Sequence, residues 1–165
     1  MNKNWSITMQ FPKIQSYNLE GRKYQLPEDF EGEVNLLLIA FHRWQQQEVD
    51  TWVPFARQLL RENPSFRYYE IPTINRSIPL FRMWLDNAMR LGIPDRQARE
   101  ATITLYLDKL AFRKSLAIPN ETNIQALLVN RAGEILWRSK GQFSEDKGQS
   151  LRQVIEGLKK AALES

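Results

Sequence analysis

The sequence predicts an α/β domain in which a central mixed sheet, made of parallel strands and a terminal antiparallel hairpin, is flanked by helices. Three observations lead to this prediction. Residues 34–41 are apolar at nearly every position, as central parallel strands are when both of their faces are buried. Segments with helical spacing alternate with strand-like runs, and right-handed crossovers make such strands parallel. Residues 124–139 contain two strand-like runs around a Gly-containing turn, which is typical of a hairpin.

The chain begins with residues 1–16, which we expect to be a loosely structured N-terminal arm, and a single domain follows over residues 17–165. For a chain of 165 residues, one domain with one sizeable core is the simplest organisation. The domain is expected to open with a β-hairpin over residues 17–26, in which Gly21 is the turn residue.

Strands and helices alternate through the rest of the predicted domain. Apolar residues recur at three- and four-residue spacing in the segments expected to be helical, which are residues 45–62, 78–92, 109–116 and 151–162. Aromatic and β-branched runs predict the strands at residues 66–71, 102–107, 124–129 and 134–139. Pro72 is expected to close the strand that begins at Phe66, and Gly133 to end the turn of the terminal hairpin.

The composition excludes several functional classes. The chain has no cysteine, which removes disulfides, thiol catalysis and every cysteine-based metal site. It has a single histidine and no phosphate-binding glycine-rich motif, so we expect no metal ion, nucleotide or other cofactor. The net charge of +4 is spread over interleaved cationic and anionic residues. A nucleic-acid binder more often has a concentrated basic stripe, so nucleic acid is the less favoured partner.

The location of the protein can be addressed from its apolar runs. The longest run covers residues 34–41, well short of the roughly 20 residues that a membrane helix needs. The first ten residues, MNKNWSITMQ, contain no apolar core of a secretory signal. We therefore expect a soluble, cytoplasmic protein that reaches the periphery of a membrane through a partner. The oligomeric state has no signature in the sequence.

Three segments resemble the thioredoxin-like superfamily, in particular its peroxiredoxin and cytochrome-maturation types. LLLIAFHRW is similar to the strand and Trp that precede the redox cysteine pair, LPEDFEG to the lead-in loop, and LLVNRAGEI to the terminal hairpin. The resemblance implies a thioredoxin-like fold. Gln45 and Glu48 stand where that superfamily has its two cysteines, and Ile124 stands where a cis-proline is usual. A thiolate is the nucleophile of that chemistry, so the resemblance argues against a redox enzyme.

Within that superfamily, the chain most resembles the mitochondrial ATP synthase assembly factors of the tenth ATPase-complex gene family and their bacterial relatives. FHRWQQQEVDTW is similar to the strand, glutamine-rich turn and Trp-containing helix of that family. LLVNRAGEILWRSKG keeps the spacing of Ile135, Trp137 and Gly141 in the family's hairpin. The resemblance implies a non-enzymatic assembly or chaperone-like role, with a membrane ATP synthase subunit as the protein partner. A generic cysteine-less thioredoxin-like protein fits these residues almost as well.

The residues expected to bind a partner lie where strands end. Ligands gather at the carboxyl ends of parallel strands in open α/β sheets. We therefore expect an extended segment of the partner to be captured there, and no residue is assigned a catalytic role. Trp44 suits an aromatic anchor, whereas Trp52 falls on an apolar helix face and is expected in the core. The partner-binding residues that we predict are His42, Arg43, Trp44, Gln45, Glu48, Arg76 and Asp108.

Three alternatives remain open at this point. His42 could serve as the general base of an enzyme with non-thiol chemistry, although no motif places a Ser nucleophile beside it. The competing interpretation is a strand-end histidine bonded to the backbone. Arg76, Arg82 and Arg90 could form a basic patch for acidic partners or lipid headgroups, or simply a solvated helix face. Weak binding of nucleic acid is the least favoured alternative.

Overall fold

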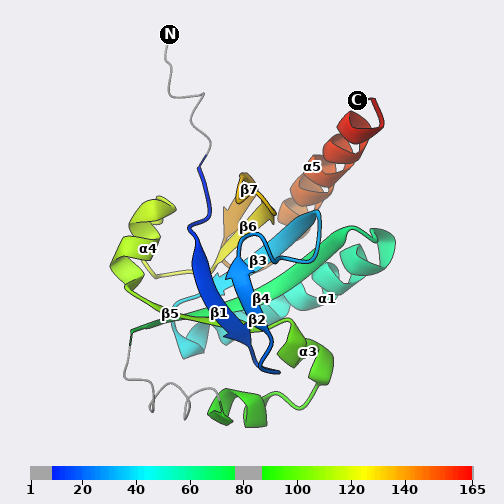
Figure 1. Cartoon of the computed structure of the whole chain (residues 1–165). Helices are drawn as coiled ribbons and strands as arrows, with labels where there is room; N and C mark the ends of the chain where they lie inside the picture. Colours follow the sequence, from blue (N-terminus) through cyan, green and yellow to red (C-terminus); the bar gives the residue numbers. More distant parts are fainter. Residues whose placement is uncertain (1–8, 77–86, 165) are drawn as a thin grey trace.

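The computed structural model describes residues 9–76 and 87–164, and these residues build one seven-stranded mixed sheet with helices on both sides (Figure 1). The strand order is β2-β1-β5-β4-β3-β6-β7. The strands are β1 (Ile14–Asn18), β2 (Lys23–Leu26), β3 (Val34–Ala40), β4 (Phe66–Asn75), β5 (Ile103–Leu107), β6 (Gln125–Asn130) and β7 (Ile135–Lys140). The described helices are η2 (Arg43–Gln45), α1 (Gln46–Glu62), α3 (Arg96–Glu100), α4 (Lys109–Ser115) and α5 (Glu145–Glu164), and residues 87–92 are also helical.

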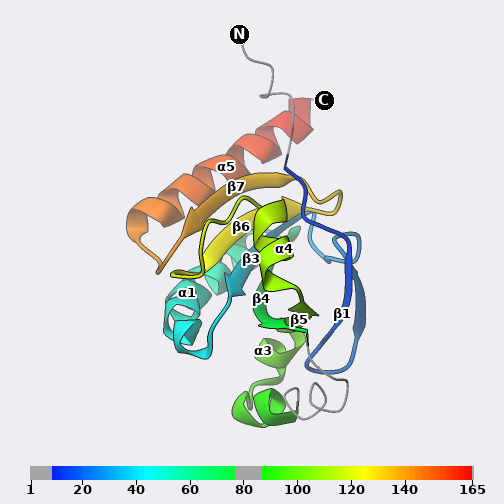
Figure 2. The same ribbon diagram turned by 90° about the vertical axis from the view of Figure 1, so that its left-hand side faces the viewer.

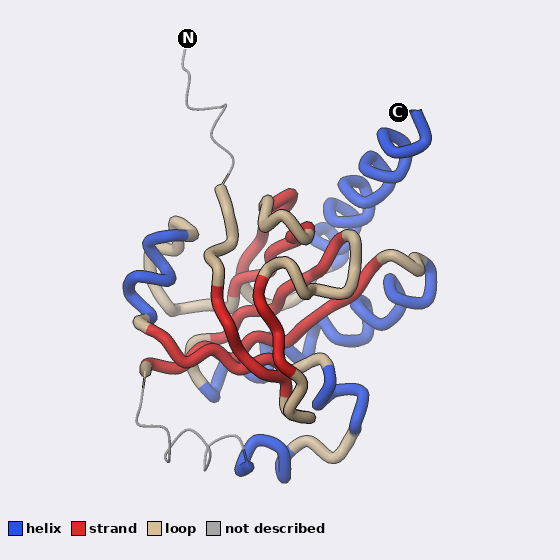
Figure 3. Tube along the Cα trace, in the orientation of Figure 1, coloured by secondary structure: helices blue, strands red, loops and turns tan. Residues whose placement is uncertain are grey.

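The directions of the strands agree with the predicted mixed sheet. β3 pairs in parallel with β4, and β4 with β5, because the connections between them are long enough to cross over a face of the sheet. β6 joins β3 in the antiparallel direction and continues into β7 through a short turn. The tube view in Figure 3 shows the strands crossing between the helices.

The central strand β3 separates two apolar layers. Its side chains alternate between the two faces, as the pleat of a strand requires. Leu36 and Leu38 pack in the layer beneath α1 and α5, together with Trp52. Leu37 and Ile39 pack in the opposite layer, which α4 covers. Figure 2 shows α5 lying beside β7, and α5 packs in the same apolar layer as α1. The predicted core position of Trp52 is correct, since its side chain is fully buried.

The N-terminal hairpin begins earlier than the sequence suggested. β1 starts at Ile14 and pairs with both β2 and β5, and Phe11 is buried in the layer beneath α4. The loosely structured arm expected over residues 1–16 therefore does not extend through residue 16. The start of β1 was missed because its polar and apolar residues are reversed. The polar side chains of Ser16 and Asn18 are buried and hydrogen-bonded, whereas Tyr17 between them is exposed.

β4 and α5 extend well beyond their predicted bounds, and one helix was not predicted. β4 continues through Pro72 to Asn75, since Pro72 lies where pairing with β3 ends and the ladder with β5 begins. The closing helix α5 begins at Glu145, six residues before the first apolar position used to predict it. α3 was not expected, and the side chain of Asp95 caps it by accepting a hydrogen bond from the backbone N–H of Gln97. Most of the helix predicted over residues 78–92 lies outside the described residues, as does Arg82.

Candidate functional site

The candidate site lies at the carboxyl end of β3, where the chain turns through η2 into α1. His42 follows the strand in an extended conformation, and Arg43, Trp44 and Gln45 form the 3₁₀ turn η2. The loop of residues 119–124, which leads into β6, lies against this turn, because the side chains of Gln45 and Glu48 bond to backbone groups of the loop. The site is therefore built from segments that are about 75 to 80 residues apart in the chain.

Gln45 closes the turn from inside the protein. Its side-chain oxygen accepts hydrogen bonds from the backbone N–H groups of Phe41 at 2.8 Å and His42 at 3.2 Å. Its side-chain amide donates to the backbone carbonyl of Glu121 at 2.6 Å. Gln45 is fully buried, so its side chain holds the site together and does not face a partner. This corrects its prediction as a partner-binding residue.

Glu48 attaches the same loop one turn further along α1. One carboxylate oxygen accepts from the backbone N–H of Ile124 at 3.1 Å, and the other accepts from the side-chain amide of Asn123 at 3.0 Å. Both positions that would carry thiols in the superfamily are thus occupied by polar side chains bonded to the 119–124 loop. Glu48 is also better described as a positioning residue than as a partner contact.

Glu121 is the centre of a charged cluster that no pattern in the sequence indicated. Its carboxylate lies 3.0 Å from Nε2 of His42, 3.1 Å from Nζ of Lys109 and 3.2 Å from Nε of Arg113. Burial alone would raise the pKa of the Glu121 carboxyl, but Lys109 and Arg113 outweigh burial and hold that pKa below its ordinary value. Lys109 also donates to the carbonyl of Phe41 at 2.9 Å, which fixes the start of α4 beside the end of β3.

The outer face of the turn is exposed. The indole of Trp44 is 62% exposed and stacks on the imidazole of His42, with ring centroids 5.8 Å apart and planes within 7° of parallel. Arg43 is exposed beside them. The structure therefore brings His42, Arg43 and Trp44 together on one accessible surface, while Gln45 and Glu48 lie beneath it.

Arg76 and Asp108 follow the two neighbouring strands. The backbone N–H of Arg76 donates to the carbonyl of Leu107, which places both residues at the adjacent ends of β4 and β5. Both are exposed, and Asp108 caps α4 by accepting from the backbone N–H of Ala111. Since Lys109 reaches the end of β3, Asp108 borders the same edge of the sheet. We call the exposed set His42, Arg43, Trp44, Arg76 and Asp108 the strand-end surface.

Other features bear on ligands. Within residues 9–76 and 87–164, no group of three or more His, Asp or Glu side chains is placed to hold a metal ion. No helix in this part of the chain is long and apolar enough to cross a membrane.

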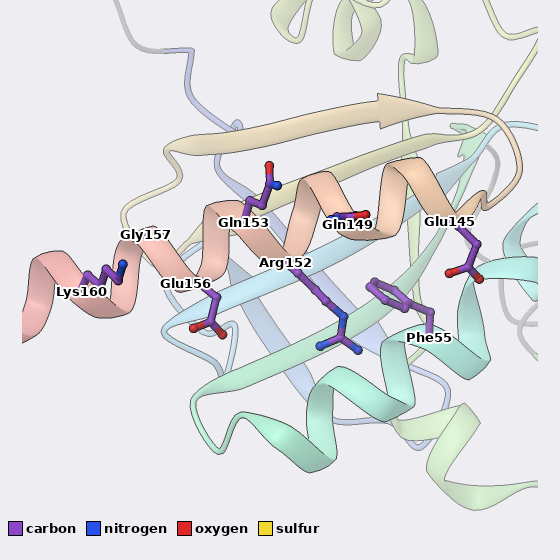
Figure 4. Close-up of a pocket in the computed structure, with 8 residues that line it drawn as sticks. All are labelled: Phe55, Glu145, Gln149, Arg152, Gln153, Glu156, Gly157 and Lys160. Carbon is purple, nitrogen blue, oxygen red and sulfur yellow. The ribbon is translucent and has the colours of Figure 1, made fainter.

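A groove of about 550 Å³ lies between α1 and α5, away from the strand ends (Figure 4). In this groove the guanidinium of Arg152 lies over the ring of Phe55 and forms an ion pair with Glu62. Arg152 therefore already has partners within the protein.

Comparisons with known proteins agree with the predicted fold. The family described as ATP10 protein matches residues 5–158. The thioredoxin domain of a thiol-disulfide oxidoreductase from Bacteroides vulgatus is 17% identical with a TM-score of 0.58, over 89% of this chain and 96% of that chain. A putative protein disulfide isomerase from Bacteroides thetaiotaomicron is 16% identical with a TM-score of 0.60, over 93% and 90% of the two chains.

A third similar structure is BsSco, a member of the Sco family of cytochrome c oxidase assembly proteins, at 16% identity and a TM-score of 0.57 over 90% of this chain and 94% of that chain. A search of curated proteins finds no match. At these identities the solved structures establish the fold alone, and the predicted thioredoxin-like fold is confirmed.

Proposed function

Because the chain belongs to the ATP10 protein family, we propose that it is a non-enzymatic assembly factor that binds a subunit of a membrane ATP synthase. The observation that carries this proposal is the replacement of the two cysteines that thioredoxin-like redox proteins have at the start of α1. Gln45 and Glu48 stand in place of the two thiols, and both are bonded to the 119–124 loop. These bonds hold the end of β3 against the loop, and the turn presents an exposed aromatic and cationic surface there.

The absence of cysteine is the chemical argument against redox function. Thiol–disulfide exchange requires attack by a thiolate on a sulfur atom. Neither an amide nor a carboxylate can replace that nucleophile, and the sequence holds no cysteine elsewhere to take the role. Without a thiol, the function that we propose for this surface is binding of a partner.

The proposed mechanism is capture of an extended segment of the partner across the strand-end surface. Trp44, held against His42, supplies a broad apolar contact, and Arg43 supplies charge beside it. Arg76 and Asp108 continue the surface along the neighbouring strand ends. In this proposal the protein is cytoplasmic and reaches the membrane periphery through its partner.

Affinity capture tests the proposal. Tagged wild-type protein and a His42→Ala/Trp44→Ala variant are incubated with gently solubilised native membranes, and captured ATP synthase subunits are identified by mass spectrometry. Tyr17→Ala is the matched control, since Tyr17 is an exposed aromatic on β1. We expect capture by the wild type and the control, and loss with the double variant. Equal capture by all three proteins would refute the proposed site.

One observation favours a second candidate, an enzyme with non-thiol chemistry. Nε2 of His42 lies 3.0 Å from the Glu121 carboxylate, and this pairing with a carboxylate is a feature of general bases. A His42→Gln variant that loses an inflection from a pH–rate profile would support this alternative, and an unchanged profile would exclude it.

A further inference from the structure

The strand-end surface carries an excess of positive charge around one exposed indole. We infer that the partner segment that binds there is acidic and presents an apolar side chain to Trp44. This inference rests on the proposed function, because it names the chemistry of the segment that the same surface would bind.

The charges of the surface are not balanced. Arg43 and Arg76 are exposed, and neither pairs with a carboxylate of residues 9–76 or 87–164. Beneath them, Lys109 and Arg113 share the single carboxylate of Glu121. The carboxylate of Asp108 is engaged at the start of α4. With Glu48 included, four cationic side chains accompany three carboxylates, and each of these carboxylates already has partners within the protein.

The spacing of the free cations suits a peptide chain. Arg43 follows β3 and Arg76 follows β4, and these strands are direct neighbours in the sheet. β4 runs three residues, about 10 Å, beyond its last pairing with β3 before Arg76 follows, and alternate side chains of an extended chain recur about every 7 Å. An extended segment that crosses the strand ends can thus place acidic side chains near both arginines. Guanidinium groups bind carboxylates in well-directed pairs.

Trp44 supplies the apolar part of the recognition. Its indole is already stacked on His42, so ordering it on binding costs little side-chain freedom. Leu110, which is 52% exposed, follows Lys109 at the start of α4 and adds apolar area near the end of β3. An indole held in place beside free arginines is typical of the anchors that dominate protein interfaces.

Synthetic peptides of alternating sequence test the inference. One peptide alternates Glu with Leu, and matched peptides replace every Glu with Gln or with Lys. Fluorescence anisotropy measures the binding of each peptide to the whole protein. We expect the acidic peptide to bind at least about tenfold more tightly than the Gln peptide and the Lys peptide to show no binding. The advantage of the acidic peptide should vanish near 1 M NaCl, where the Debye length falls to about 3 Å.

Charge-reversal variants test whether Arg43 and Arg76 bind the acidic peptide. Arg43→Glu/Arg76→Glu should weaken the acidic peptide about tenfold or more, whereas Lys160→Glu, an exposed reversal on α5, should have little effect. Trp44→Ala should weaken both the acidic and the Gln peptide.

Two outcomes would overturn the inference. The first is equal affinity for the acidic and Gln peptides, or no binding of either. The second is binding of phosphatidylserine–phosphatidylcholine vesicles through the same arginines in place of the peptide. In both cases, loss of ATP synthase capture by the His42→Ala/Trp44→Ala variant would still support the proposed function, so the two failures are distinguishable.

Discussion

Replacing Glu121 with Gln tests the charged cluster beneath the strand-end surface. The change removes the carboxylate that pairs with His42, Lys109 and Arg113, but leaves the backbone carbonyl that accepts from Gln45. The loop therefore stays attached, and the measurement isolates the charge. Exposed ion pairs contribute about 0–1 kcal/mol, and breaking a buried one costs about 3–5 kcal/mol. The Glu121 side chain is 20% exposed, which places it between these limits.

We therefore expect Glu121→Gln to lower the free energy of unfolding by about 2 kcal/mol at pH 7. For a domain of this size, that corresponds to a fall of about 4–8 °C in Tm. Urea denaturation and thermal melting followed by circular dichroism measure both quantities. The control is Glu28→Gln, which removes a more exposed pair with Lys13 at 3.7 Å and should cost less than about 1 kcal/mol.

The pH dependence gives the same prediction a second readout. The pKa of Glu121 is lowered in the folded protein, so its contribution is fully present above the unfolded pKa of about 4.3. It is lost as the pH falls through the folded pKa. The difference between the wild type and Glu121→Gln should therefore shrink toward about pH 3. A cost at pH 7 no larger than that of Glu28→Gln, or a cost unchanged at low pH, would refute the role assigned to this cluster.

Three further predictions concern other parts of the fold. Gln45→Ala should destabilise the protein by about 2–3 kcal/mol in urea denaturation, because it leaves the buried N–H of Phe41 and the partly buried carbonyl of Glu121 without this partner. A loss below about 0.5 kcal/mol would contradict this. Burial raises the pKa of Glu70, so its ionised form opposes folding at neutral pH. Glu70→Gln should therefore raise the Tm at pH 7, and this gain should disappear below the unfolded pKa of about 4.3. An equal gain in Tm at pH 7 and below that pKa would argue against burial as the cause. Gly133 has a φ of +91° and little space around it, so Gly133→Ala should cost about 1–2 kcal/mol, whereas Gly157→Ala in the open flank of α5 should gain up to about 1 kcal/mol. The same sign of change in both glycine variants would refute that account.

The sequence predicted the parts of the fold that follow a regular pattern. The apolar run of residues 34–41 predicted the central strand because a strand covered on both faces needs apolar side chains on both. Gly133 predicted the terminal turn because its positive φ favours glycine. β1 began earlier than predicted because its buried side chains, Ser16 and Asn18, are polar, and its exposed one is aromatic.

The candidate site was only partly predictable. Trp44 and His42 could be placed at a strand end because the strand before them was clear from the sequence. Gln45 reads as an exposed polar residue at a helix start, and its burial depends on the carbonyl of Glu121, a long way along the chain. Glu121 itself lies in a loop without periodicity, so no local pattern connects it to His42, Lys109 and Arg113. Contacts of this kind follow from the tertiary fold alone.

Site-specific photo-crosslinking tests the central claim most directly. A photoreactive phenylalanine analogue replaces Trp44 in one protein and Tyr17 in another, since both are exposed aromatics, one in the η2 turn and the other on β1. The proteins are irradiated in native cells, and crosslinked partners are identified by mass spectrometry. We predict that position 44 crosslinks to a subunit of the membrane ATP synthase and that position 17 does not. Crosslinks to that subunit from position 17 alone, or from neither position, would contradict binding at the strand-end surface.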